Sequence, residues 1–401
     1  MGEGKEHPIS DASRIFLDAA RAPEAPGTHV LIIGVGRYAY GKGAGASPVA
    51  GDLRQLTSPP ISARAMADWF LTSFKNAAKP LSSVSLMISD AQPSIYQPPR
   101  PAGAPQVQLP AATLANVKEA ARHWADRVGT HQDNLAVFYF CGHGASLGQQ
   151  AALLLHDFGE PGAEFDGAID LDVLRGTMRN SPAIQQVYLL DCCRTDADDF
   201  YRNEAGIGSR VVSVASFQRK HSIPPQQFVL FPTIDGEEAF GIKGTVSVFT
   251  SSMIDAMSFA AADGATGVWR TTTGSLLSTV DQLVRHRVPE PLAKRSKPNA
   301  LDASSFDFNV IDEPLVAHSY VTISDLDFWG QVEIECVDPE GAEPTQRRHS
   351  SEAANEMCCT FELHEGRWCF RGMLPDTPPS IQEHERTLRV PVAYVKLEVT
   401  P

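Results

Sequence analysis

Short apolar runs, each bounded by glycine or polar residues, alternate along this chain with stretches whose apolar residues repeat at helical spacing. Residues 29–36 (HVLIIGVG), 134–141 (NLAVFYFC) and 186–191 (QVYLLD) are short and almost continuously apolar, as expected of strands buried on both faces of a sheet. Residues 61–74 and 113–128 place apolar side chains on one helical face. The alternation predicts an α/β fold, an α/β/α sandwich around a mostly parallel central sheet.

The other segments of the first 300 residues follow the same pattern. The polar lead-in, residues 1–28, contains an expected short helix near residues 15–21, and the Pro- and Gly-rich segments 41–60 and 92–112 are expected to be loops. Thr113 is a suitable N-cap for the helix that follows it. Further strands are expected at residues 84–89, 151–156 and 228–233, and further helices at residues 171–179, 248–262 and 274–288.

The sequence changes character after about residue 304. Short segments of alternating polar and apolar residues, split by Pro, Gly and Asp, cover residues 316–323, 330–337, 358–363 and 387–399. This pattern predicts a smaller C-terminal β-rich domain, an antiparallel sandwich. We therefore divide the chain into a lead-in (1–28), an α/β domain (29–300) and a β-rich domain (301–401).

The charge balance excludes several partners. The 34 Lys and Arg residues face 48 Asp and Glu residues, so the formal net charge is -14. Nucleic acids and anionic membranes attract proteins with a positive field, and neither is an expected partner. Seven cysteines, an odd number that includes two adjacent pairs, make a poor disulfide framework and favour a reducing compartment. With neither a signal-peptide pattern nor an apolar run near 20 residues, we expect a cytoplasmic location.

Two of the buried strands run directly into reactive residues. One is followed by Gly142-His143-Gly144 and the other by Cys192-Cys193-Arg194, so that His143 and Cys193 are 50 residues apart. The carboxyl ends of parallel strands meet at one edge of a sheet, where reactive groups gather. There His143 can accept the thiol proton of Cys193 and later donate a proton to a leaving amine. The backbone N–H groups of Gly144 and Cys193 can form an oxyanion hole.

These residues give the chain a resemblance to the caspase/metacaspase clan of cysteine peptidases, in particular to its prokaryotic members. Gly142-His143-Gly144 resembles the His-Gly element of the clan, and Asp191-Cys192-Cys193 resembles the metacaspase Asp-x-Cys element, with a His-to-Cys spacing known from caspases. The resemblance covers about residues 29–288. It implies a caspase-like fold and a thiol protease, a hydrolase, in which Cys193 is the nucleophile and His143 its base.

Asp191 and the loop after Cys193 distinguish this chain within the clan. Metacaspases continue Cys-His-Ser-Gly and caspases Cys-Arg-Gly, whereas Cys193 is followed by Arg194, Thr195 and Asp196. The resemblance implies that Asp191 is a substrate-binding residue that lines a pocket for Arg or Lys, where caspases have Gln. A carboxylate in an apolar pocket favours a guanidinium through paired hydrogen bonds. The alternative is that Asp191 caps or orients the loop.

The polar segment after Cys193 carries two further hypotheses. Asp196, Asp198 and Asp199 are oxygen ligands of the kind that calcium prefers, and some metacaspases need calcium, but a solvated acidic loop is the simpler interpretation. We therefore expect no cofactor. Residues 196–225 are also a candidate self-cleavage segment, because the chain there is polar and contains basic residues: Arg202, Arg210, Arg219 and Lys220.

Two other patterns carry less weight. Gly34-x-Gly36-x-x-Ala39 follows a strand as in dinucleotide-binding folds, but further glycines and Pro48 follow in place of the required helix. The adjacent cysteines lack the two-residue spacing of structural zinc sites. Cys141 and Cys192 are expected to serve packing.

Two hypotheses for the function follow. The favoured one is a cytoplasmic caspase-like cysteine endopeptidase that cleaves protein or peptide substrates after Arg or Lys, processes itself, and acts in stress, cell-death or defence signalling. The alternative is a catalytically silent caspase-fold scaffold that binds protein partners. The C-terminal domain offers no chemistry of its own, and by analogy it is the place where a regulatory protein partner is expected.

Overall fold

The computed structural model describes residues 15–18, 25–45, 47–99, 105–147, 150–192, 195–196, 207–217, 223–232, 244–289, 298–312, 316–353, 356–375 and 379–400. The chain forms two compact units, one of Met1–Ser247 with Asn299–Ser304 and one of Val248–Pro298 with Ser305–Pro401. The domain boundary expected after residue 300 stays a prediction. Within the described ranges, no helix is long and apolar enough to cross a bilayer.

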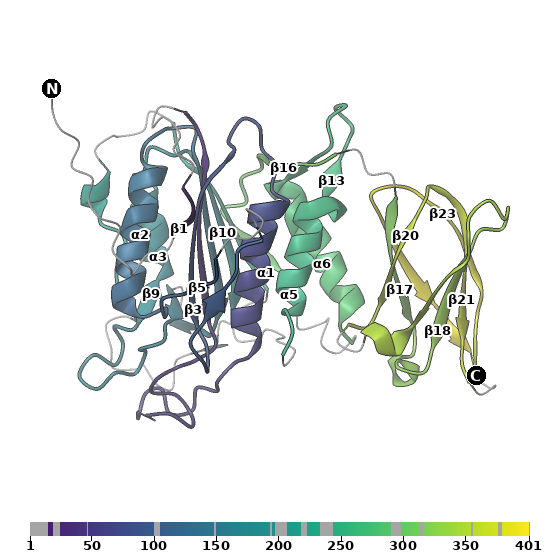
Figure 1. Ribbon diagram of the computed structural model, residues 1–401, viewed down its shortest axis with the longest axis horizontal. Coiled ribbons are helices and arrows are strands. Elements are labelled where there is room, and N and C mark those ends of the chain that lie inside the picture. The colour runs from purple at the N-terminus through teal and green to yellow at the C-terminus, as the bar shows by residue number, and fades with distance from the viewer. Residues whose placement is uncertain are drawn as a thin grey trace. The chain divides into compact units, whose positions relative to one another are not determined.

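The first unit is built on a seven-stranded sheet in the order β1-β3-β2-β6-β10-β12-β15 (Figure 1). The five inner strands run parallel, and the two edge strands, β1 and β15, pair antiparallel with their neighbours. The predicted mostly parallel central sheet is therefore confirmed. The strands are β1 (Ile15–Asp18), β2 (Thr28–Val35), β3 (Leu81–Ser89), β6 (Leu135–Gly142), β10 (Gln185–Cys192), β12 (Gln226–Phe231) and β15 (Asn299–Leu301).

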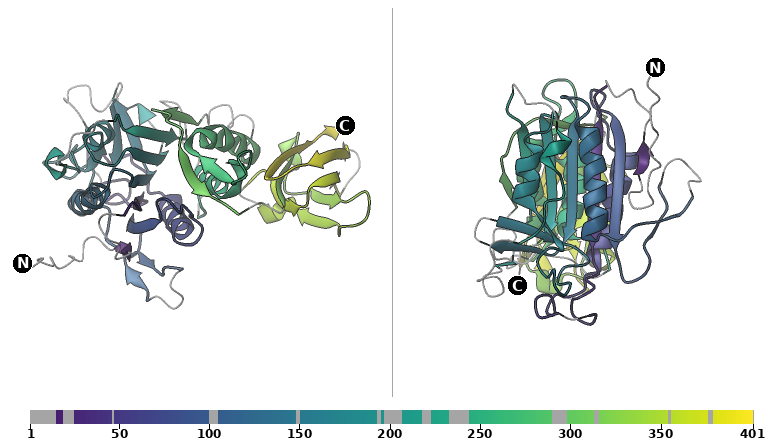
Figure 2. Two further views of the ribbon diagram at one scale, coloured as in Figure 1. Left: turned by 90° about the horizontal axis from the view of Figure 1, so that it is seen from above. Right: turned by 90° about the vertical axis from the view of Figure 1, so that its left-hand side faces the viewer.

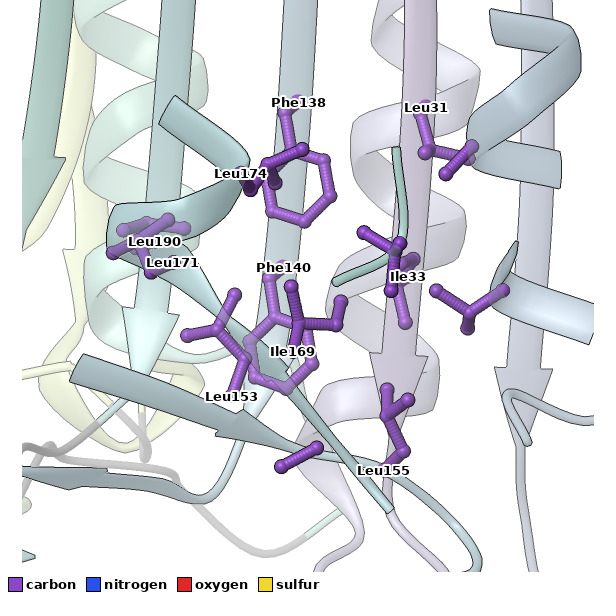
Figure 3. Close-up of a cluster of buried hydrophobic side chains, with 14 of the residues drawn as sticks. Leu31, Ile33, Phe138, Phe140, Leu153, Leu155, Ile169, Leu171, Leu174 and Leu190 are labelled. Carbon is purple, nitrogen blue, oxygen red and sulfur yellow. The ribbon is translucent and has the colours of Figure 1, made fainter. Parts of the chain in front are cut away.

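Helices cover both faces of this sheet. On one face, α2 (Leu114–Val128) and α3 (Leu171–Met178) pack over a continuous apolar cluster. Figure 3 shows part of this cluster, in which strand residues such as Ile33, Phe138 and Phe140 meet α3 and the strands beside it. The other face is covered by α1 (Ser58–Thr72). Thr113 caps α2 as predicted, since its side chain accepts a hydrogen bond from the Asn116 N–H.

Two glycines at the end of β2 allow α1 to approach the sheet closely. A Cβ at Gly34 would lie 2.6 Å from the Cβ of Ala63, and a Cβ at Gly36 would lie 2.4 Å from the carbonyl oxygen of Leu56. No side chain larger than hydrogen fits at either position. Packing therefore accounts for the glycines that resemble a dinucleotide fingerprint, and the helix that such a fingerprint needs begins only at Ser58.

A smaller sheet follows the carboxyl end of β6, in the order β11-β7-β8-β9. Figure 2 shows the central sheet of the first unit from its end, with α1 and α2 on opposite sides of it. The strands of the smaller sheet are β7 (Gly144–Leu147), β8 (Gln150–Leu154), β9 (Ala168–Asp170) and β11 (Thr195–Asp196). β7 pairs antiparallel with β8 but parallel with β11. The strand that follows His143, β7, is therefore paired with the strand that begins at Thr195, β11. A short 3-10 turn, Val214–Ser216, lies further along the chain.

Two sequence predictions for this unit are wrong. Residues Ile15–Asp18 form strand β1 in place of a helix, because they pair with the edge of β3. The proline-rich segment 92–112 contains a two-stranded ladder, β4 (Ile95–Tyr96) with β5 (Val107–Gln108), in place of loop alone. The partner of β1 is distant in sequence, whereas β4 and β5 are two residues each and too short to leave a local pattern.

The second unit combines two helices with β-sheets. α5 (Val248–Asp255) continues into a π-helical turn, Ala256–Ala260, and α6 is Thr273–Arg287. A small antiparallel sheet joins β13 (Ala262–Asp263), β14 (Arg270–Thr272) and β16 (Asp307–Val310). The remaining strands form sheets β20-β17-β24 and β19-β18-β21-β23, with the pair β22-β25. These strands are β17 (Ala317–Ile323), β18 (Glu333–Val337), β19 (Gln346–His349), β20 (Cys359–Leu363), β21 (Gly366–Met373), β22 (Ser380–Ile381), β23 (His384–Leu388), β24 (Val392–Leu397) and β25 (Val399–Thr400), with 3-10 turns at Leu326–Phe328 and Ser350–Ala353.

The β-rich character predicted for the C-terminal region is confirmed, but its strands are not all antiparallel. β17 and β24 run parallel, with Tyr320 opposite Tyr394. A parallel pair needs a long crossover connection, and the strands between β17 and β24 provide it. Residues from both larger sheets, including Ile334, Phe361 and Trp368, share one apolar cluster.

A buried arginine connects α6 to the rest of the second unit. The Arg287 side chain is only 4% exposed and forms ion pairs with Asp255 of α5 and with Glu356. Its guanidinium also lies 5.2 Å from the ring of Tyr320 on β17, whose hydroxyl donates to Asp255 at 2.7 Å. These carboxylates raise the pKa of Arg287 against the opposing effect of burial. One cation therefore holds together two helices and a strand of the C-terminal sheets.

We expect Arg287→Ala to destabilise the second unit by about 3 kcal/mol, because it leaves two carboxylates near the protein interior without their cation. Arg285→Ala is the matched control on the same helix. Arg285 pairs with Asp281 at 2.8 Å on the exposed face, so its loss is expected to change stability by no more than about 0.5 kcal/mol. Urea unfolding of both variants measures the difference, and equal losses would contradict the importance assigned to the buried pair.

Candidate active site

The ends of β6 and β10 lie side by side in a fixed register. Asp191 pairs with Cys141 and Cys192 with Gly142, so each residue lies opposite the one 50 positions earlier. Beyond the strand ends, β11 and β7 repeat the same offset, with Thr195 opposite Ala145. Gly142 and Ala145, on either side of His143, are therefore each paired with the residue 50 positions later. The predicted partner of His143, Cys193, lies outside the described residues.

Contacts with Tyr38 and Arg54 help to fix the position of His143. Its backbone N–H donates to the hydroxyl of Tyr38 at 2.8 Å, and the two rings lie 5.0 Å apart at a tilt of 45°. Its Nε2 lies 2.9 Å from the carbonyl oxygen of Arg54. A carbonyl oxygen can only accept a hydrogen bond, so Nε2 carries the proton and Nδ1 is the unprotonated nitrogen of the neutral ring.

The loop after β2 carries both Tyr38 and Arg54 and is itself held by Gln55. The Gln55 side-chain oxygen accepts from the backbone N–H of Tyr38 at 2.8 Å, and its nitrogen donates to the Tyr38 carbonyl at 3.0 Å. On the other side, the His156 carbonyl accepts from the N–H of Ala39, and His156 Nδ1 lies 2.8 Å from the Arg37 carbonyl oxygen. Tyr38 is fully buried between them.

Asp191 is a buried carboxylate with defined donors. It is 5% exposed and accepts hydrogen bonds from the hydroxyl of Ser247 and, at 3.4 Å, from the thiol of Cys141. The backbone N–H of Ser247 donates in turn to the hydroxyl of Ser62 on α1 at 3.0 Å. Burial, followed by the neighbouring Asp191 carboxylate, raises the pKa of the Cys141 thiol well above its usual value. Cys141 is thus a neutral donor and a poor nucleophile.

The neighbouring cysteine has a different environment. Cys192 is buried in the apolar cluster on the face that α2 and α3 cover, so its predicted packing role is confirmed. Cys141 does more than the packing that its sequence suggested, because its thiol also donates to Asp191. Cys192 thus packs on one face of the sheet, and the hydrogen-bonded group of Cys141, Asp191 and Ser247 lies on the other.

The predicted site residues are described to different extents. His143 and Asp191 lie at the ends of adjacent strands, and Gly144 begins β7. Asp198 and Asp199, like Cys193, lie outside the described residues, while Asp196 ends β11. Among the residues that are described, no three His, Cys, Asp or Glu side chains are grouped to hold a metal ion.

Sequence reasoning did not identify Tyr38, Gln55 or Ser247. Tyr38 follows β2 by three residues, and β2 is the neighbour of β6, so the rule that strand ends converge could have included it. Ser247 and Gln55 lie in a helix lead-in and a loop, where no local pattern distinguishes them from other polar residues.

Comparison with known proteins identifies the family. The model of the caspase domain, peptidase family C14, matches residues 28–305. The chain therefore belongs to the caspase-domain family of cysteine peptidases, hydrolases that act on proteins, and the caspase-like fold predicted from the sequence is confirmed.

The individual relatives are distant. The uncharacterized protein y4kE of Sinorhizobium fredii is 25% identical over 257 residues, which are 58% of this chain and 70% of the relative. A solved protein of Geobacter sulfurreducens is similar over 72% of this chain and 100% of its own, with 13% identity and a TM-score of 0.42. Caspase-1 of Spodoptera frugiperda is similar over 75% of this chain and 96% of its own, with 12% identity and a TM-score of 0.41.

Proposed function

We propose that this chain is an active cysteine endopeptidase in which Cys193 is the nucleophile and His143 its base. The observation that carries the proposal is the common register on either side of His143: Cys192 pairs with Gly142, and Thr195 with Ala145. Paired strands lie about 4.8 Å apart, so two residues at equivalent positions of this register come within reach of one another. Membership of a peptidase family supports the same assignment.

The protonation of His143 determines the direction of proton transfer. With Nε2–H bonded to the Arg54 carbonyl, Nδ1 takes the proton from the Cys193 thiol as sulfur attacks the scissile carbonyl. The backbone N–H groups of Gly144 and Cys193 stabilise the oxyanion. The imidazolium then gives its proton to the leaving amine, and water hydrolyses the thioester to release the acid and restore the thiol.

Peptide cleavage tests the proposed dyad directly. We expect the protein to cleave a fluorogenic peptide that ends in Arg, and Cys193→Ala and His143→Ala each to lower the rate by at least about 10³-fold. The assay is run with calcium and with a chelator, to test whether Asp196, Asp198 and Asp199 bind calcium. We interpret them as a solvated loop and expect equal rates in both. Negligible turnover by the wild type and both variants under all conditions would instead support the catalytically silent scaffold.

The second prediction concerns specificity. Asp191 offers a desolvated carboxylate beside the dyad, and such a group binds a guanidinium or ammonium much more strongly than a neutral amide does. Asp191→Asn keeps the size and the acceptor for Ser247 but removes the charge. We expect kcat/KM for Arg and Lys peptides to fall about 100-fold, with no comparable loss for peptides with a neutral residue at the same position.

The control for this specificity change is Asp170→Asn. Asp170 caps α3 by accepting from the Val173 N–H at 2.9 Å and belongs to none of the contacts of the site. Its replacement tests whether any loss of a structural carboxylate alters peptide preference. If Asp191→Asn keeps the preference for basic residues, Asp191 does not bind the substrate and only orients the strand end.

The third prediction is self-cleavage within residues 196–225. Arg210 is an exposed basic residue in the described part of this segment, as a trypsin-like cleavage site requires. We expect intact-mass spectra of the incubated wild type to show two fragments, and Cys193→Ala to remain one chain. Arg210→Gln distinguishes cleavage there from cleavage after Arg202, Arg219 or Lys220. A wild type that stays intact after long incubation would exclude self-processing.

Participation in stress, cell-death or defence signalling, a cytoplasmic location and a regulatory partner for the C-terminal region complete the proposal. They are supported by analogy within the family alone.

A further inference from the structure

We infer that Tyr38 is a positioning residue for His143, and that its hydroxyl sets the orientation in which the imidazole works as a base. This inference rests on the proposed role of His143 as the base of the dyad. We assign Tyr38 no direct role toward the substrate or Cys193; it acts through His143.

The Tyr38 hydroxyl connects two strand ends. It accepts the backbone N–H of His143 at 2.8 Å and donates to the carbonyl oxygen of Val35, the last residue of β2, at 3.2 Å. One hydroxyl thus satisfies a donor at the end of β6 and an acceptor at the end of β2. A phenylalanine fills the same space but does neither, and a partly buried N–H without its acceptor favours a shift of the peptide that bears it.

The same residue also limits the orientation of the imidazole ring. The Tyr38 ring lies against the His143 ring, while Nε2 is held by the carbonyl of Arg54. Arg54 immediately precedes Gln55, and the Gln55 side chain bonds both backbone polar groups of Tyr38. The backbone contact and the ring contact of His143 therefore come from one loop, which Gln55 holds in place. A shift of the His143 peptide thus changes the Nε2 contact as well.

Gly142 supplies independent support for this contact. A Cβ at Gly142 would lie 3.0 Å from the Tyr38 hydroxyl, closer than ordinary van der Waals contact. The ring of Phe140 and the carbonyl of Val35 would lie at 3.1 and 3.2 Å. The glycine before His143 thus leaves the space in which the hydroxyl reaches the histidine N–H. Approach of the hydroxyl, and not only freedom of the backbone, explains why this position lacks a side chain.

The test compares Tyr38→Phe with Tyr188→Phe. Tyr188 is equally buried in the same unit and donates its hydroxyl to Gln186 at 3.2 Å, at the amino end of β10 and remote from His143. For Tyr38→Phe we expect kcat to fall about 10- to 100-fold with KM nearly unchanged, since a misplaced base slows chemistry without altering substrate contacts. Tyr188→Phe should keep the wild-type kcat, and thermal unfolding of both variants reports any general loss of stability.

Alkylation of the Cys193 thiol by iodoacetamide across the pH range gives a second readout that needs no peptide turnover. A well-placed imidazole promotes thiolate formation near neutral pH. We expect Tyr38→Phe to shift the alkylation profile to higher pH and to lower the rate at pH 6 about 10-fold. Gly142→Ala, which crowds the same hydroxyl, should impair the wild type more than it impairs Tyr38→Phe.

The outcomes separate the inference from the proposed function. A wild-type alkylation profile like that of an ordinary thiol, together with no turnover, would overturn the dyad itself and the inference with it. A wild type that turns over and alkylates early, with Tyr38→Phe indistinguishable from it, would overturn the positioning role and leave the dyad intact. Equal losses of kcat in Tyr38→Phe and Tyr188→Phe would reduce Tyr38 to a structural residue.

Discussion

The parallel pairing of β6 with β10 is the constraint on which the site depends. Side chains alternate along β6: Phe138 and Phe140 enter the cluster beneath α2 and α3, while Val137 and Tyr139 are buried on the opposite face. A slip of one residue would exchange the two faces and place apolar and polar groups wrongly on both. The hydrophobic core therefore fixes the register, and the register in turn pairs Asp191 with Cys141 and Cys192 with Gly142 at the ends of the two strands.

Local sequence was sufficient where an element is defined by its own residues. The buried strands could be predicted because runs such as NLAVFYFC are apolar on both faces, and the start of α2 because Thr113 can cap it. Strand β1 and the parallel pairing of β17 with β24 could not, since each depends on a partner far along the chain. The ladder of β4 with β5 could not either, since each of its strands is only two residues long. Pairing partners, and not propensities, were the missing information.

The candidate site divides in the same way. His143 and Asp191 could be found because each stands at the end of a strong strand, and the family resemblance carries Cys193. Tyr38 and Ser247 reach the site through a loop and a helix lead-in, so their roles arise only when the fold brings them to His143 and Asp191. A supporting residue is recognised by what it contacts, and a sequence contains no record of contacts.

These supports reach the two candidate site residues, His143 and Asp191, from different elements. The loop after β2 holds the imidazole through Tyr38 and the Arg54 carbonyl, whereas the Asp191 carboxylate is held by Ser247, which Ser62 of α1 holds in turn. Under the proposed function, substitutions at Asp191 or Ser247 would alter which side chain a substrate must present, while the Tyr38 and Arg54 contacts of His143 come from another element. If the proposed roles hold, such an arrangement lets specificity change through one set of supports while the proposed catalytic pair keeps the other.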